Sequence, residues 1–253
     1  MPSVNISTFY PDARYTWSGN ATLLNGFNTL AVYNTNTGTP SNGGTCCLWT
    51  VPANATWATF EVWGGGGGGA GACCCQGQVW GGGSGSYARR TISVVPGNTY
   101  RICAGGSTGC SVTCYGCDGF PSYVQTETAS NAINLCAQGG GHGISNCAAG
   151  YGSCNWTSCI CGSYCGQDFG ICGHQAGQNN STCGYQSYSF VANPTYIAQG
   201  VGRSMDYCQI FHGNQMQGCS VFPGGGSGTA NTVSGSCCWG GWGQGGLVLV
   251  TYK

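Results

Sequence analysis

The sequence has very little charge. Its 253 residues include only 6 Lys and Arg and 6 Asp and Glu, and the formal net charge is zero. The only adjacent basic residues are Arg89 and Arg90, whereas a nucleic-acid-binding protein needs a basic patch to neutralise phosphates. We therefore expect no nucleic-acid partner. A neutral surface of Gly, Ser, Thr, Asn and Gln suits the exterior of a particle that stays soluble without long-range attraction.

Long apolar runs and helical patterns are also missing. No stretch of about 20 apolar residues is present, which is the length that a helix needs to cross a bilayer. We therefore expect no membrane insertion. No segment has the apolar repeat of about 3.6 residues that indicates an amphipathic helix. The periodicity that does occur is of period two, which predicts β-strands.

Signatures of catalysis are lacking as well. The histidines His142, His174 and His212 lie far apart, and neither a Gly-x-Ser-x-Gly elbow nor a His-Glu-x-x-His motif occurs. The glycine run that begins at Gly64 lacks the Gly-Lys-Ser/Thr of a phosphate-binding loop, and the only lysine is Lys253. No spacing singles out two carboxylates for glycoside cleavage. We expect a protein that is not an enzyme and has no cofactor.

Glycine and cysteine are present in large excess, with 49 Gly and 21 Cys. Glycine loses much backbone entropy on folding, but 8 Trp, 14 Tyr and 8 Phe provide burial that disordered chains lack. Disulfides would offset the entropy by restricting the unfolded chain, at roughly 2–4 kcal/mol each. Because the number of cysteines is odd, at least one is free or joins another chain. The candidate disulfide residues are Cys46, Cys47, Cys73, Cys74, Cys75, Cys103, Cys110, Cys114, Cys117, Cys237 and Cys238.

The cysteine density indicates an oxidising environment, although residues 1–6 carry no secretory signal. A protein made in the host cytoplasm and released by lysis would reconcile the two. The alternative is a cytosolic metal-binding protein, in which Cys114-x-x-Cys117 and Cys159-x-Cys161-x-x-x-Cys165 would form the halves of a zinc knuckle. Such spacings arise by chance among 21 cysteines, so disulfides are preferred and no metal ligand is assigned.

Two strands on either side of a glycine run organise the chain. Apolar and polar residues alternate before Gly64 and again from Tyr87, and Pro96-Gly97-Asn98 then forms a turn into another strand. The terminal strand is apolar on both faces, so we expect it to be central in its sheet rather than at an edge. The expected strands are 56–63, 87–95, 99–103 and 246–252, with further ones at 132–137 and 185–191. The rest of 103–183 is interpreted as one long cross-linked lobe.

The chain divides by composition near residue 45. Residues 1–45 contain no cysteine and end in a polar, turn-rich run. They are interpreted as an arm or docking segment, with an ordinary first hairpin of the same domain as the alternative. Residues 46–253 form the cysteine- and glycine-rich β domain. Cys46 and Cys47 are adjacent, and geometry disfavours a bond between neighbours, so each is expected to have a different partner.

Residues 46–253 resemble the glycine-rich domain of bacteriophage tail-fibre and other virion proteins. The resemblance rests on W-T-V-P-A-N-A-T, F-E-V-W-G-G-G-G-G-G, G-S-Y-A-R-R-T-I-S-V-V-P-G-N-T-Y and the closing G-L-V-L-V-T-Y. It implies an all-β fold with a small, sandwich-like sheet framework and long glycine-rich, disulfide-tied loops. It also suggests that 64–69 adopts the extended three-residue helix of polyglycine, packed through Cα–H···O contacts, and places the terminal strand beside Phe60 and Val62.

The resemblance further implies a structural protein on the virion surface, of the capsid knob or decoration type. Its partners would be other virion proteins of the capsid or tail. The odd number of cysteines and the cysteine-free arm at 1–45 suggest a homo-oligomer, a dimer or trimer. The alternative is a tail adhesin whose tip binds a host-surface glycan or protein. Candidate binding residues are aromatics expected on loops, namely Trp80, Tyr151, Trp156, Tyr164 and Phe169.

Overall fold

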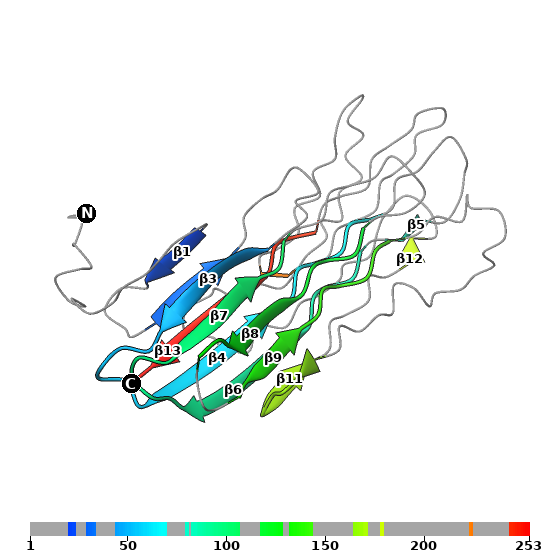
Figure 1. Ribbon diagram of the computed structural model, residues 1–253. Coiled ribbons are helices and arrows are strands. Elements are labelled where there is room, and N and C mark those ends of the chain that lie inside the picture. The colour runs from blue at the N-terminus through cyan, green and yellow to red at the C-terminus, as the bar shows by residue number, and fades with distance from the viewer. Residues whose placement is uncertain are drawn as a thin grey trace, which may run out of the picture.

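The protein is an all-β structure of two antiparallel sheets (Figure 1). The computed structural model describes residues 20–23, 29–33, 44–69, 79–80, 82–106, 117–128, 132–143, 164–171, 178–179, 223–224 and 243–253. None of these residues is helical, which confirms the predicted fold class.

The larger sheet has six strands in the order β1-β2-β13-β4-β6-β11, and the smaller has five in the order β10-β9-β8-β7-β3. The six strands are Asn20–Leu23 (β1), Thr29–Tyr33 (β2), Leu247–Tyr252 (β13), Trp57–Trp63 (β4), Tyr87–Ser93 (β6) and Phe169–Ile171 (β11). The five are Tyr164–Cys165 (β10), Asn134–Ala137 (β9), Ser122–Thr126 (β8), Thr99–Ala104 (β7) and Thr45–Thr50 (β3). A separate two-stranded ribbon pairs Gln178–Asn179 (β12) with Val79–Trp80 (β5).

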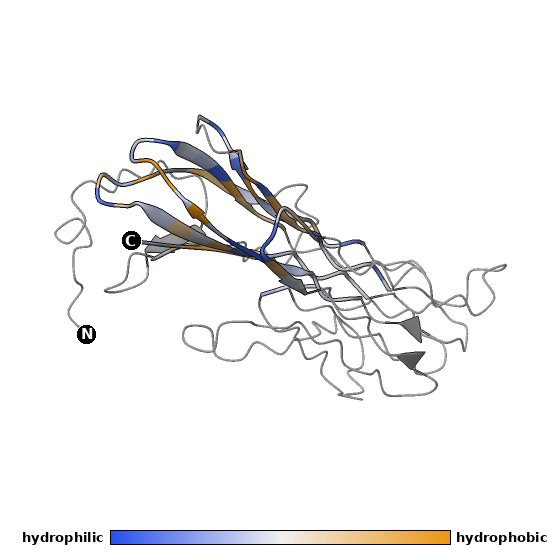
Figure 2. Cartoon of the chain, turned by 90° about the horizontal axis from the view of Figure 1, so that it is seen from below, coloured by the Kyte–Doolittle hydropathy of each residue, from blue (hydrophilic) through white to orange (hydrophobic). Residues whose placement is uncertain are grey.

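The two sheets pack face to face and enclose one aromatic and aliphatic core. Trp49 of β3 is fully buried at its centre, with ring centroids 5.7 Å from Phe60, 5.8 Å from Tyr100 and 5.6 Å from Tyr252. These four rings come from both sheets, so they fix the sheets against each other. Figure 2 shows the apolar colouring concentrated on the strands of this sandwich.

The terminal strand β13 lies in the middle of the six-stranded sheet, between β2 and β4. Val248 is the register partner of Val62, and Val250 is that of Phe60. Both faces of β13 are buried except at Thr251. The predictions of a central terminal strand and of its partner are therefore confirmed.

The hairpin β1–β2 precedes residue 45. β2 pairs with β13, and Leu30 and Val32 are fully buried members of the same core as residues from 46 onward. The β-branched Thr29 and Val32 and the aromatic Tyr33 favour a strand in β2.

The segment 103–183 contains more strands than its sequence indicates. β9 falls within the predicted 132–137, but β8, β10 and β11 were not predicted. β8 reads S-Y-V-Q-T, and only Val124 is an apolar residue that points into the core, so its pattern is weak. The predicted strand at 185–191 lies outside the described residues.

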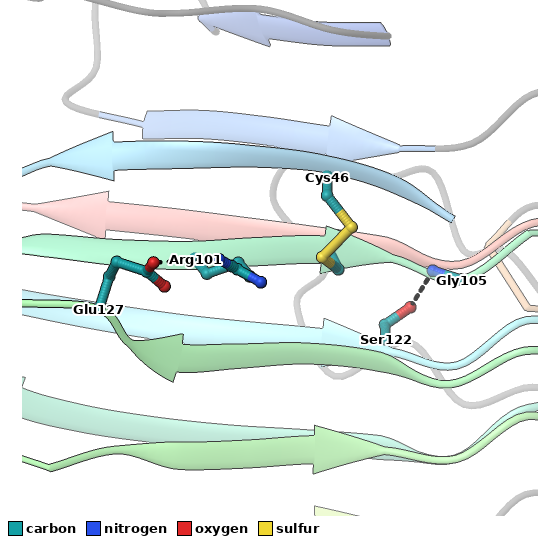
Figure 3. The surroundings of a disulfide bond; sticks show 6 residues. Cys46, Arg101, Gly105, Ser122 and Glu127 are labelled. Atoms are coloured by element: carbon teal, nitrogen blue, oxygen red, sulfur yellow. Dashed lines mark hydrogen bonds and ion pairs between the residues drawn. A yellow bond between two sulfur atoms is a disulfide. The ribbon is translucent and has the colours of Figure 1, made fainter. Parts of the chain in front are cut away.

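A disulfide joins Cys46 of β3 to Cys103 of β7, which are register partners with Cα atoms 4.1 Å apart (Figure 3). Cys47 instead packs against the core as a free thiol, and burial raises its pKa to about 11. Successive strand residues point to opposite faces, which is why the two adjacent cysteines differ. The disulfide ties the edge strand β3 to the sheet.

Candidate functional site

The strands of the sandwich continue into a bundle of glycine-rich segments (Figure 1). We define the glycine bundle as residues 64–69 after β4, 82–86 before β6, 105–106 after β7, 117–121 before β8, 138–143 after β9 and 243–246 before β13. Three of these segments extend the six-stranded sheet and three extend the five-stranded sheet. Because the same chain segments run through both parts, the sandwich positions every segment of the bundle.

Hydrogen bonds in the bundle follow a three-residue period. The amide of Gly64 donates to the carbonyl of Ser86 at 2.9 Å, and three residues later Gly67 donates to Gly83, also at 2.9 Å. A β-ladder would repeat every two residues instead. Residues 64–69 are called the central segment. Its amides donate to backbone carbonyls in this order: Gly64 to Ser86, Gly65 to Phe120, Gly66 to Gln244, Gly67 to Gly83 and Gly68 to Cys117.

Successive amides of the central segment therefore point at three different neighbours. Two of the neighbours, 82–86 and 243–246, extend strands of the same sheet as β4, whereas 117–121 extends the other sheet. The carbonyls of Gly65 and Gly68 accept from Gly140 and Gly143, at 2.8 Å each. A segment with three residues per turn and neighbours on all sides is the polyglycine helix suggested by the resemblance.

The two sheets merge in the bundle. In an ordinary sandwich, side chains hold the sheets about 10 Å apart, and no backbone bond crosses between them. Here Gly65 of one layer donates to Phe120 of the other at 2.9 Å, and Gly246 donates to Gly105 at 2.8 Å. Backbone N–H···O bonds therefore cross directly between the two layers in the bundle.

Glycine is required by these approaches. A Cβ atom on Gly67 would fall onto the carbonyl of Gly141, and one on Gly85 would fall onto the carbonyl of Gly64. The obstacle is backbone in each case, so no side-chain rotation can relieve it. The bundle therefore tolerates no side chain at these positions.

Two serines mark the junction between sandwich and bundle. The amide of Gly105 donates to Oγ of Ser122 at 2.8 Å (Figure 3), and Oγ of Ser86 donates to the carbonyl of Gln138 at 3.1 Å. Both serines are buried. They satisfy backbone groups where the spacing between the sheets narrows, since a buried polar group without a partner is costly.

One ionisable pair lies on the bundle. Nδ1 of His142 is 2.6 Å from Oδ1 of Asp118, which also accepts the backbone amide of His142 at 2.8 Å. The side-chain hydrogen bond raises the pKa of His142 and lowers that of Asp118, while partial burial opposes both shifts. The pair joins 138–143 to 117–121, and so adds a side-chain hydrogen bond between two segments of the same layer.

The structure describes only some of the sequence-predicted cysteines. Cys46 and Cys103 are brought together, whereas Cys47 and the exposed Cys117 are free thiols. Among the described residues, no group of three or more His, Cys, Asp or Glu side chains could hold a metal ion. The remaining disulfide candidates lie outside the described residues: Cys73, Cys74, Cys75, Cys110, Cys114, Cys237 and Cys238.

Three of the five predicted binding aromatics lie among the described residues. Trp80, Tyr164 and Phe169 lie in the short strands β5, β10 and β11 rather than in loops. Figure 1 shows β5 at the far end of the bundle and β11 beside the sandwich. Phe169 is half exposed and packs against Tyr87, with ring centroids 6.2 Å apart. Tyr151 and Trp156 lie outside the described residues.

Sequence reasoning missed the contacts that build the site. The backbone carbonyls of Ser86, Phe120 and Gln244 accept hydrogen bonds from the amides of residues 64–66. Nothing in the local sequence of these three residues indicates those bonds. The available signal was the glycine that recurs where β4, β6, β7, β9 and β13 meet the bundle. No described helix is long and apolar enough to cross a membrane.

Comparison with known proteins gives one family. The model of a family described as "Glycine-rich domain" matches residues 36–253. No curated protein matches the chain.

Proposed function

The chain belongs to the glycine-rich domain family, and on this premise we propose that it is a non-enzymatic structural protein on the exterior of a bacteriophage virion, of the capsid knob or decoration type. The merging of two sheets into one glycine bundle is the observation that carries the proposal. Such a bundle extends the sandwich without needing a second hydrophobic core, and so makes a projection from a compact base.

The chemistry of the described residues supports a structural role. Glycine makes up most of the bundle, and its Asp118–His142 pair serves to connect two segments. The low charge of the chain favours a surface without long-range attraction. The motifs of both chain ends resemble those of virion glycine-rich domains, which supports a particle as the location and virion proteins as the partners.

Immunogold electron microscopy of purified particles tests the proposal. Antibody raised against the folded protein should label intact virions at many sites over the capsid surface. As a control, the particles are first washed in detergent without reductant, which removes protein that adheres nonspecifically. Labelling of the host cytoplasm without labelling of released particles would refute a virion location.

A tail adhesin is the second candidate, and one observation favours it. β5 pairs with β12 at the end of the bundle away from the sandwich. A receptor-binding tip would occupy this end, because binding residues are commonly carried beyond a supporting scaffold. Gold particles confined to one vertex or to the tail end would select the adhesin over the decoration protein.

A further inference from the structure

A single row of residues crosses the whole five-stranded sheet. Cys46 of β3 is the register partner of Cys103 of β7, which is that of Tyr123 of β8. Tyr123 is in turn the partner of Cys136 of β9, and Cys136 is that of Cys165 of β10. Register partners in a sheet point to the same face. The row therefore has a pair of cysteines at each end and a tyrosine at its centre.

The row lies on the face of the sheet that points away from the core. Residues on either side of it in sequence, such as Ile102, Val124 and Leu135, are fully buried members of the core, and alternate residues of a strand face opposite ways. Cys136 is half-buried and Cys165 is exposed. Soluble reagents can therefore reach the pair from the side of Cys165.

The two ends of the row have the same backbone arrangement. Directly opposed residues of antiparallel strands have Cα atoms about 4.5–5.5 Å apart, inside the range of about 4.4–6.8 Å that disulfides span. The Cys46–Cys103 end is already bonded. At the other end the two thiols are neighbours: burial, with the Cys165 thiol beside it, raises the pKa of Cys136 to about 11.

We propose that Cys136 and Cys165 form a second cross-strand disulfide, which mirrors Cys46–Cys103 at the opposite edge of the sheet. The oxidant is a small-molecule disulfide of the glutathione class. The exposed Cys165 thiolate attacks it, forms a mixed disulfide and releases one small thiol. The Cys136 thiolate then attacks Sγ of Cys165 and releases the second small thiol. Two protein thiols are oxidised, one external disulfide is reduced to two thiols, and the protons pass to solvent and to the released thiolates.

The bond would cross-link residues 164–171, a segment that bridges the two sheets and is called the strap below. Residues 164–171 pair with β9 of one sheet through β10 and with β6 of the other through β11. Gly166 accepts a bond of 2.9 Å from Arg90, and Asp168 accepts one of 2.8 Å from the amide of Thr91. These contacts are exposed, and exposed hydrogen bonds contribute little individually. A covalent link from Cys165 to Cys136 would anchor one end of the strap to β9 of the five-stranded sheet.

Peptide mapping tests the pairing. The full chain is folded in a mixture of reduced and oxidised glutathione, blocked with N-ethylmaleimide and digested with pepsin at acid pH, which prevents disulfide exchange. The expected product is a cross-linked peptide pair that joins Cys136 to Cys165 and separates on reduction. Cys136→Ser and Cys165→Ser should each abolish it, while Cys117→Ser, which removes an exposed thiol outside the row, should leave it intact.

Hydrogen exchange gives an independent readout of the strap. Amides of residues 166–171 should exchange roughly tenfold or more slowly after oxidation in the wild-type chain, because the bond opposes local opening. They should show no such change in Cys165→Ser. Modification of both cysteines by N-ethylmaleimide in the oxidised wild type would overturn the proposal, as would a bond from either to another cysteine. Protection of both thiols by added zinc without a cross-link would overturn it as well.

Discussion

The hydroxyl of Tyr87 donates a hydrogen bond of 2.7 Å to Oε1 of Glu61, and both side chains are buried. They lie on the side of the six-stranded sheet that faces away from the main core, where Trp63 packs against the Tyr87 ring at 4.9 Å between centroids. Burial and the bond to Glu61 raise the pKa of Tyr87 above its ordinary value. The buried carboxyl of Glu61 therefore accepts a hydrogen bond from a buried tyrosine, and Arg89 is its register partner on the neighbouring strand.

Replacement of that donor should destabilise the fold. Tyr87→Phe leaves the Glu61 carboxyl buried without the hydroxyl, and we expect a loss of about 1–3 kcal/mol in the free energy of unfolding. The double variant Tyr87→Phe with Glu61→Leu removes both polar partners and should recover part of the loss. Urea unfolding with the disulfides intact measures both. Equal stability of Tyr87→Phe and wild type would contradict the assigned role.

A single methyl group should disrupt the glycine bundle. Gly67→Ala places a Cβ against the backbone of Gly141, and overpacking of this kind typically costs about 1–3 kcal/mol. Amides of 64–68 should also exchange faster. The matched control is Gly97→Asn, at a turn where φ is +85° and no atom lies near the position of a Cβ, and Asn tolerates this conformation. A tolerated alanine at Gly67 would mean that the segments are not in direct contact.

The terminal strand should carry a large share of the stability. Leu249 is buried on β13, so Leu249→Ala should cost on the order of 2–5 kcal/mol. Leu48→Ala is the control, because Leu48 is an exposed leucine on the edge strand β3. Under non-reducing conditions, amides of 247–251 and 58–63 should exchange slowly together. Rapid exchange at either segment would contradict their pairing.

The Asp118–His142 pair should make the bundle sensitive to pH. The pKa of His142 is raised in the folded state, so its contribution is complete below the unfolded pKa of about 6.5 and is lost as the pH rises through the folded value. The pKa of Asp118 is lowered, so its contribution is present above about 3.8 and is lost as the pH falls through the folded value. The pair therefore contributes most between these two limits.

An NMR titration of the His142 ring checks this dependence. Asp118→Asn removes the charge and the acceptor carboxylate, and the pKa of His142 should fall toward that of an unperturbed histidine. Arg101 and Glu127 form an exposed ion pair elsewhere, 3.0 Å apart, and Glu127→Gln serves as the control that leaves the His142 titration unchanged. An unchanged titration in Asp118→Asn would show that the pair does not form in solution.

The sequence predicts the sandwich better than it predicts the bundle. The strands β4 and β6 carry clear period-two patterns, and the turn at 96–98 indicates β7. Apolar residues on both sides of β13 correctly indicated a central strand. β3 reads T-C-C-L-W-T, where cysteines obscure the pattern although Trp49 is central to the core. Strand order and register depend on contacts between residues that are far apart in sequence, and local periodicity carries no information about them.

The cysteine pairing illustrates the same limit. Cys46 and Cys103 are 57 residues apart, and spacing alone does not select one connectivity among so many cysteines. The pairing register of β3 and β7 places these two cysteines opposite each other and so determines the connectivity. The sequence also does not predict the hydrogen-bond partners of the glycine segments. Glycine has no side chain, so a run of glycines has no pattern that shows which way each amide points.

The three-residue hydrogen-bond pattern also determines how the protein would respond to a pulling force. The bundle segments run alongside one another and continue as the central strands of both sheets, so tension applied at the far end is transmitted along several continuous backbones. Hydrogen bonds perpendicular to that direction are then loaded in shear and must yield together, whereas bonds that are peeled apart break one after another. Each segment of the bundle continues into its strand along an unbroken stretch of the chain. We therefore expect the bundle to resist extension more than bending.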